Sequence, residues 1–231
     1  MAKTKAVFFD WLNTIAHPQP DRHEIYSQVL PEFGIQPSQH KLLKAIYSAE
    51  TQEPSGPPYR WDESRKNEAC IRYQEIVLEM VDARLPRESL LQVLNKVSAI
   101  ARKVTYAIYD DVLPTLKTLR ERGLVLGLIT TMGSDMNPIL SKLDLQHYLQ
   151  FTVSSKEVGV DKPHPPIFLA ALERAGVDAS AAIYVGDQYE TDVIGARGVG
   201  IKPILIDRYD LLPEVRDCPR IHTVAEVTNH I

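Results

Sequence analysis

The chain has 231 residues, of which 44% are hydrophobic and 24% charged, and its formal net charge is −4. This composition is typical of a globular protein and excludes a disordered, fibrous or membrane-embedded chain. Without a basic surplus, nucleic acid is not an expected partner. No apolar stretch reaches the roughly 18 residues of a membrane helix, and the stretch at 6–9 is too short for a signal peptide. We therefore expect a cytoplasmic protein without membrane association, whose two cysteines, Cys70 and Cys218, are reduced thiols.

The first half of the chain combines one strand with a helical block. Residues 5–10, Lys-Ala-Val-Phe-Phe-Asp, predict a short buried parallel strand whose carboxyl end carries Asp10. The segment His17-Pro-Gln-Pro20 should then break regular structure. Helices are expected over about 22–33, 38–51, 62–82 and 87–103, with a Pro/Gly-rich interruption at 53–58 and no convincing strand among them.

From Tyr109 onward, helices and apolar strands alternate. Helices are predicted over 111–122, 135–143, 165–175 and 190–197, and strands over 124–129, 151–153, 182–185 and 201–206. This alternation predicts an α/β fold, a Rossmann-like parallel sheet with helices on both faces. If the first strand joins that sheet, residues 1–16 and 107–231 form one core, and residues 17–106 form an all-helical cap domain inserted into it.

Polar residues gather where the predicted strands end. In open α/β sheets, ligands bind beyond the carboxyl ends of the strands, which is where Asp10, Thr130 and Asp187 fall. Asp192 follows shortly after, and carboxylates at close range repel each other unless a cation lies between them. Oxygen ligands of this kind suit Mg²⁺. Lys162, in a loop before a helix, would add a positive charge.

Simpler interpretations exist for two of these residues. A single aspartate after a strand is often only a helix cap, which is the alternative for Asp187. A solvated surface lysine is the alternative for Lys162.

Four segments resemble the motifs of the haloacid dehalogenase superfamily, in that family's order. They are Phe8-Phe9-Asp10-Trp11-Leu12-Asn13-Thr14, Leu128-Ile129-Thr130-Thr131, Lys162-Pro163-His164-Pro165 and Val185-Gly186-Asp187 to Asp192. The first is similar to apolar residues followed by Asp-x-Asp-x-Thr, and the second to an apolar strand ending in Thr or Ser. The helical insert between them is similar to the cap of subfamily I members.

The resemblance implies a Mg²⁺-dependent hydrolase in which Asp10 is the covalent nucleophile. Thr130 would bind phosphoryl oxygens, Lys162 would hold nucleophile and phosphate together, and Thr14 and Thr131 would contact the substrate. The implied metal ligands are Asp10, the main-chain carbonyl of Leu12, Asp187 and Asp192.

The chain departs from the family pattern at Leu12, where most phosphatases of the superfamily carry an aspartate that acts as general acid. Such catalysis is typically worth about 10²- to 10⁴-fold, so the departure favours easily departing leaving groups or a replacement donor. His17 and Asp21 are candidates for that donor. In the predicted cap, Arg60, between Tyr59 and Trp61, is a candidate substrate contact, although these residues could simply pack the cap.

The leading hypothesis is therefore a phosphatase that acts on a small phosphorylated metabolite. Dehalogenase-type substitution and phosphonatase-type cleavage stay open because both also lack the acid at position 12. A non-catalytic module that accepts phosphate or binds a ligand is the alternative of another class. The sequence identifies neither the substrate nor the oligomeric state.

Overall fold

The computed structural model describes residues 3–57, 67–132 and 135–231. The chain forms two compact units. One, here called the core unit, contains Met1–His17 and Tyr106–Ile231, and the other, the helical unit, contains Pro18–Thr105. In the part of the chain that the structure describes, the helices are too short or too polar to cross a membrane.

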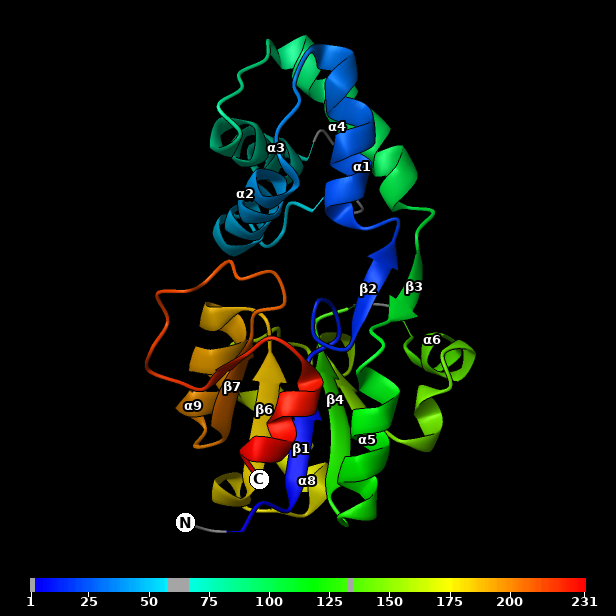
Figure 1. Ribbon diagram of the computed structural model, residues 1–231, viewed down its shortest axis with the longest axis vertical. Coiled ribbons are helices and arrows are strands. Elements are labelled where there is room, and N and C mark those ends of the chain that lie inside the picture. Colours follow the sequence, from blue (N-terminus) through cyan, green and yellow to red (C-terminus); the bar gives the residue numbers. More distant parts are fainter. Residues whose placement is uncertain (1–2, 58–66, 133–134) are drawn as a thin grey trace. The chain divides into compact units, whose positions relative to one another are not determined.

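A six-stranded sheet forms the centre of the core unit, and all its neighbouring strands run parallel. In spatial order its strands are β5 (Phe151–Ser154), β4 (Val125–Thr130), β1 (Ala6–Phe9), β6 (Ala182–Gly186), β7 (Lys202–Ile206) and β8 (Arg220–Ile221). The first strand of the chain thus lies centrally, with Phe9 beside Leu128 and Val185. This confirms the predicted α/β class (Figure 1).

Helices cover both faces of this sheet, and β1 shows why. Its alternate residues Val7 and Phe9 enter one apolar cluster, while Ala6 and Phe8 enter another. The helix α5 (Val112–Glu121) and the 3₁₀ helix η7 (Val224–Asn229) pack on the first cluster, and α8 (Pro165–Ala175) and α9 (Ile194–Gly198) on the second. Figure 1 shows α5 and η7 in front of the sheet. A strand buried on both faces reads as a continuous apolar run, which is the pattern of 6–9.

Shorter helices complete the core unit. They are α6 (Asn137–Lys142), η4 (Leu145–His147), α7 (Ser155–Val158), η5 (Ala179–Ala181) and η6 (Tyr189–Val193). Of these, η6 is a single turn of π-helix directly before α9. The sequence predicted one continuous helix over 190–197, so the wider turn is a local correction to that prediction.

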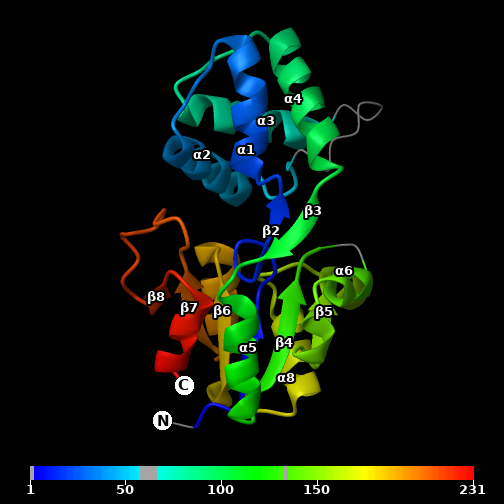
Figure 2. The ribbon, with the colours of Figure 1, turned by 45° about the vertical axis from the view of Figure 1, so that its right-hand side comes forward.

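The helical unit has its own apolar core. Its helices are α1 (Arg22–Val29), η1 (Leu30–Phe33), α2 (Gln39–Gln52), α3 (Glu68–Met80) and α4 (Arg87–Ala101). In α4, the residues Leu90, Val93, Leu94 and Val97 recur at helical spacing and are all buried. Figure 2 shows α1 and α4 from a second direction.

The sequence missed three strands, of which β8 has only two residues. The chain leaves and re-enters the core unit through β2 (Ala16–Gln19) and β3 (Thr105–Ile108), which form a two-stranded sheet. The predicted break at 17–20 was therefore wrong for its first three residues. Proline lacks a backbone donor, yet it is tolerated at the edge of a sheet, and in a two-stranded sheet every strand is an edge.

Asp21 caps α1 where β2 gives way to the helical unit. Its side chain and that of Glu24 form a reciprocal capping box, with Glu24 Oε2 accepting from the Asp21 N–H at 2.7 Å. Burial alone would raise the pKa of Asp21, but the hydrogen bond from His23 and the charge of Arg22 hold it below its ordinary value. Asp21 is therefore ionised in the folded protein at neutral pH.

Replacing this cap should weaken the helical unit. Asp21→Ala is expected to lower the free energy of unfolding by about 1 kcal/mol, the usual loss for an N-cap, measured by urea unfolding at pH 7. The folded pKa is lowered, so the difference should be full above the unfolded pKa of about 4. It should shrink as the pH falls below that value through the lowered folded pKa, where the carboxyl of the folded protein becomes protonated. Ser38→Ala is the control, since Ser38 caps α2 through one exposed 3.3 Å bond and should cost less. Equal stability of Asp21→Ala and the wild-type protein would contradict the capping role.

Candidate active site

Three carboxylates from two stretches of the chain meet at the carboxyl ends of β1 and β6. Asp10 directly follows β1, and its N–H donates to the Val185 carbonyl at 2.8 Å. Asp187 directly follows β6, and Asp192 lies in η6. One oxygen from each carboxylate lies within 4.8 Å of the others. The structure thus brings together the three acidic residues that the sequence placed at one site.

Lys162 lies between two of these carboxylates. Its Nζ donates to Asp10 Oδ1 at 2.5 Å and to Asp192 Oδ1 at 2.6 Å. Only 7% of the residue is exposed, so the alternative of a solvated surface lysine is wrong. Lysines are almost never buried unless paired, and here two carboxylates provide the pairing.

Tyr184 is a member of this cluster that the motif comparison missed. It lies in β6, is fully buried, and its hydroxyl donates to Asp192 Oδ1 and accepts from Lys162 Nζ, both at 2.9 Å. The sequence did contain a signal that Tyr184 has a polar partner. A tyrosine inside an otherwise apolar buried strand needs a hydrogen-bond partner for its hydroxyl, and alternation along β6 puts residue 184 on the same face as Gly186.

The loop 11–16, which follows Asp10, contacts the third carboxylate, that of Asp187, through Asn13. Its turn is closed by the N–H groups of Ile15 and Ala16, which donate to the Trp11 carbonyl at 3.1 and 3.0 Å. Asn13 adopts a left-handed backbone conformation with φ of 57°, which asparagine tolerates better than most residues. Its Nδ2 donates to Asp187 Oδ2 at 2.9 Å. Asp187 therefore binds a side chain from another loop, a contact that a role as helix cap alone does not explain.

Burial and charge set the protonation of the site. Burial raises the pKa of Asp10 to about 6, although the Lys162 ammonium opposes that rise. Burial would lower the pKa of Lys162, but Asp10 and Asp192 outweigh it and raise that pKa. Lys162 is therefore an ammonium ion at neutral pH, and Asp10 is mostly a carboxylate.

The donor set fits a divalent cation. Lys162 supplies one positive charge against three carboxylates, so a divalent ion would neutralise the remaining two negative charges. All the donors are oxygen atoms, which suits Mg²⁺ rather than a softer metal. Asp10, Asp187 and Asp192 are the side chains that would hold it. The Leu12 carbonyl stays a predicted fourth protein ligand.

The other predicted site residues are three threonines and Arg60. Thr130 ends β4 and is buried, and its Oγ1 accepts from the Met132 N–H at 3.1 Å. Thr131 is the next, half-buried residue. Thr14 is fully buried, and its hydroxyl has no hydrogen-bond partner among the described residues. Arg60, Tyr59 and Trp61 lie outside the described residues.

The two candidates for a replacement acid have partners in their own units. The His17 ring packs on the Tyr109 ring, with 4.8 Å between centroids. Asp21 caps α1 as described above.

A family model for haloacid dehalogenase-like hydrolases matches residues 4–200. The chain belongs to the haloacid dehalogenase-like hydrolase family. This confirms the resemblance seen in the four sequence motifs, and the match spans both units of this family member.

Two curated relatives are similar to this chain over less than half of its length. A glyceraldehyde 3-phosphate phosphatase of Methanopyrus kandleri is 41% identical over 101 residues, 43% of each chain. A phosphoserine phosphatase of Thermus thermophilus is 37% identical over 110 residues, 47% of this chain and 44% of the relative. The chain therefore spans about half the length, or less, of these curated relatives.

A solved structure is similar over nearly the whole chain. The 2-haloacid dehalogenase of Pseudomonas syringae pv. Tomato is 26% identical, with 98% of this chain and 97% of that one covered and a TM-score of 0.55. Phosphatases and a dehalogenase are thus both among the similar members of this hydrolase family.

Gly186 is required for the position of Asp192. A Cβ added at Gly186 would overlap the Asp192 carboxyl group. Gly186→Ala should therefore displace this carboxylate and weaken Mg²⁺ binding by about 10- to 100-fold, the usual effect of disturbing a metal site's surroundings, as measured by isothermal titration calorimetry. Gly198→Ala in α9 is the matched control, because its new Cβ would meet no atom within 4 Å. Equal Mg²⁺ affinity of the two variants would refute the packing argument.

The pKa of Asp10 is open to direct measurement. In chelator-treated protein, the carboxyl ¹³C resonance of Asp10 should titrate with a midpoint of about 6. Lys162→Met removes the ammonium that lowers this pKa, so the midpoint should rise further. Lys156→Met, which changes an exposed lysine in α7, should leave it unchanged. A midpoint near the ordinary value of 3.8 would contradict the raised pKa of Asp10.

Proposed function

We propose that the protein is a Mg²⁺-dependent phosphatase that acts on a small phosphorylated metabolite through an aspartyl-phosphate on Asp10. One observation carries this proposal: three carboxylates lie within 4.8 Å of one another and a single buried ammonium pairs with two of them, leaving a negative site that a divalent cation and a phosphate group would complete. Two relatives whose names state phosphatase activity on small phosphorylated metabolites support it.

In the first step, an Asp10 carboxylate oxygen attacks phosphorus. A bond from this oxygen to phosphorus forms, the bond from phosphorus to the ester oxygen breaks, and the leaving group departs as an alkoxide with the bonding electron pair and takes a proton from water. Lys162 orients Asp10 and offsets negative charge on the phosphoryl oxygens, and the Thr130 hydroxyl donates to one of them. Thr14, Thr131 and Arg60 are proposed as further substrate contacts.

In the second step, water attacks the phosphorus of the aspartyl-phosphate, which releases phosphate and restores the Asp10 carboxylate. The Asp10, Asp187 and Asp192 carboxylates and the Leu12 carbonyl would hold Mg²⁺. When bound, the ion would neutralise charge on the phosphoryl group. Tyr184 and the Gln188 N–H, which donate to the two oxygens of Asp192 at 2.9 and 3.0 Å, fix the orientation of this carboxylate.

The central experiment replaces the nucleophile. Asp10→Asn should abolish release of phosphate from p-nitrophenyl phosphate and should prevent transfer of ³²P to the protein, because an amide is a poor nucleophile. Circular dichroism serves as the folding control. A chelator should likewise stop turnover in the wild-type protein, and added Mg²⁺ should restore it. Undiminished activity of Asp10→Asn would overturn the proposal.

Position 12 allows a sharper test of the leaving group. Leu12 is half-buried and has an apolar side chain, so it cannot protonate a departing alkoxide. We expect Leu12→Asp to raise kcat/KM for alkyl phosphates by up to about 10²-fold, the lower end of the range for general acid catalysis. Turnover of p-nitrophenyl phosphate should change little, because p-nitrophenolate leaves without a proton. An equal rise in kcat/KM for both substrates would show that the new carboxyl group does not act as a general acid.

Dehalogenase-type substitution at carbon is the second candidate, favoured by the similar 2-haloacid dehalogenase structure and by Leu12, since a halide leaves without a proton. The acidic cluster argues against it, because a 2-haloacid is itself an anion and three carboxylates paired with one ammonium would repel it. Halide release that continues in the presence of a chelator would favour this candidate. Stable phosphorylation of Asp10 without turnover would instead favour a phosphate-accepting module.

A further inference from the structure

A second buried cation in the core unit contacts the loop that follows Asp10. Arg208 lies just after β7, and only 8% of its side chain is exposed. Its Nε and one terminal nitrogen both donate to the Thr14 carbonyl, at 3.1 and 2.7 Å. This contact joins residues 194 positions apart in the chain.

Two further contacts fix the guanidinium of Arg208. It forms an ion pair with Asp111 at 3.2 Å, and Asp111 also accepts from the Val224 N–H at 2.6 Å. The flat face of the guanidinium lies over the Tyr109 ring, 3.7 Å from its centroid. Only arginine combines forked donors with a flat face that stacks on an aromatic ring.

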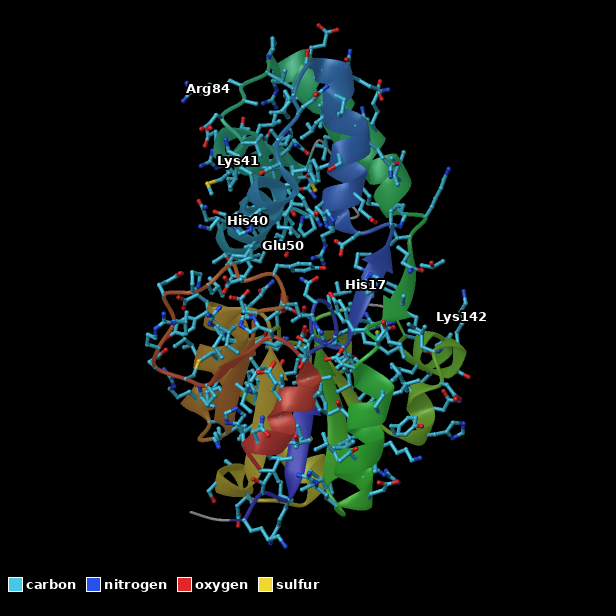
Figure 3. The ribbon with its side chains drawn as sticks, viewed as in Figure 1. His17, His40, Lys41, Glu50, Arg84 and Lys142 are labelled. Atoms are coloured by element: carbon cyan, nitrogen blue, oxygen red, sulfur yellow. The ribbon has the colours of Figure 1, made fainter. Side chains whose placement is uncertain are left out.

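The same Tyr109 contacts two residues that follow Thr14 in the chain. Its N–H donates to the Ile15 carbonyl at 3.4 Å, and its ring packs against that of His17 on β2, which is labelled in Figure 3. Arg208 and Tyr109 thus hold the end of the loop 11–16 against the core unit.

This loop leads directly to the acidic cluster. The turn is closed by hydrogen bonds to the Trp11 carbonyl, and Asn13 within it donates to Asp187. A shift at Thr14 is therefore transmitted to Asn13, and from Asn13 to the Asp187 carboxylate. It also moves the Leu12 carbonyl, the predicted metal ligand.

We propose that Arg208 is a positioning residue for the active site, which holds the loop 11–16 through the Thr14 carbonyl so that Asn13 keeps Asp187 in place. The inference rests on the proposed function for its kinetic consequences, but the contacts themselves do not depend on it. Arg208 belongs to none of the four motif segments, and its hydrogen bonds and ion pair go to Thr14 and Asp111 rather than to the three carboxylates.

The test compares Arg208→Lys and Arg208→Gln with Arg220→Ala in the full-length protein. Arg220 is the control, because it is also an ion-paired arginine in the C-terminal part of the core unit, and it contacts Asp207 and Asp210 at 2.8 and 2.6 Å. Three quantities are measured: hydrogen exchange of the amides of residues 13, 15 and 16, the Mg²⁺ dissociation constant, and kcat and KM for p-nitrophenyl phosphate. Thermal unfolding gives the stability of each variant.

Both Arg208 variants should speed exchange of the loop amides by about tenfold, as expected when a hydrogen bond from a charged donor is lost. Mg²⁺ binding should weaken by about tenfold, and kcat should fall by about 10- to 100-fold while KM changes little. Arg220→Ala should lose a similar amount of thermal stability without these three effects.

The outcomes separate this inference from the proposed function. If the Arg208 variants match Arg220→Ala in exchange, Mg²⁺ affinity and kcat, Arg208 is merely structural and the inference is overturned, while the phosphatase proposal stands. If the wild-type protein shows no phosphatase activity, the proposed function fails, and unchanged exchange and Mg²⁺ binding in the Arg208 variants would still refute the inference.

Discussion

The candidate site depends on one buried ammonium ion shared by two carboxylates. Lys162 contacts Asp10 and Asp192, which belong to stretches of chain 182 positions apart, and each side chain is at most 10% exposed. Breaking such a buried pair by removing one partner leaves an uncompensated charge and is strongly destabilising. Two other side chains fix these groups by hydrogen bonds. Tyr184 bonds to Asp192 and Lys162, and Asn13 donates to Asp187.

Much of the architecture was predictable because it follows from short-range patterns. The apolar run of β1 is buried on both faces. Three helices of the core unit, at 112–121, 137–142 and 165–175, begin and end within two residues of the predicted limits 111–122, 135–143 and 165–175. Asp10, Thr130 and Asp187 were placed together because parallel strands end at the same edge of the sheet. Asp192 and Lys162 were candidates for the same site, and the family motifs then implied their roles.

What the sequence missed depends on contacts between distant segments. Two prolines beside His17 suggested a break, but pairing with β3 stabilises β2 there. The role of Tyr184 depends on Lys162 arriving from a loop 22 positions earlier, and the contact of Arg208 with Thr14 joins opposite ends of the chain. No local pattern encodes which cation reaches which carbonyl. The π-helical turn of η6 is similarly set by its tertiary contacts, since Asp192 within it binds Lys162 and Tyr184.

The most direct test of the account is a crystal structure with Mg²⁺ and beryllium fluoride, a mimic of the phosphoryl group. The account predicts the fluoride complex bonded to an Asp10 oxygen, with Mg²⁺ bound by Asp10 and Asp187 and with Lys162 still contacting Asp10. A metal ion bound elsewhere, or a fluoride complex that is not bonded to Asp10, would contradict it.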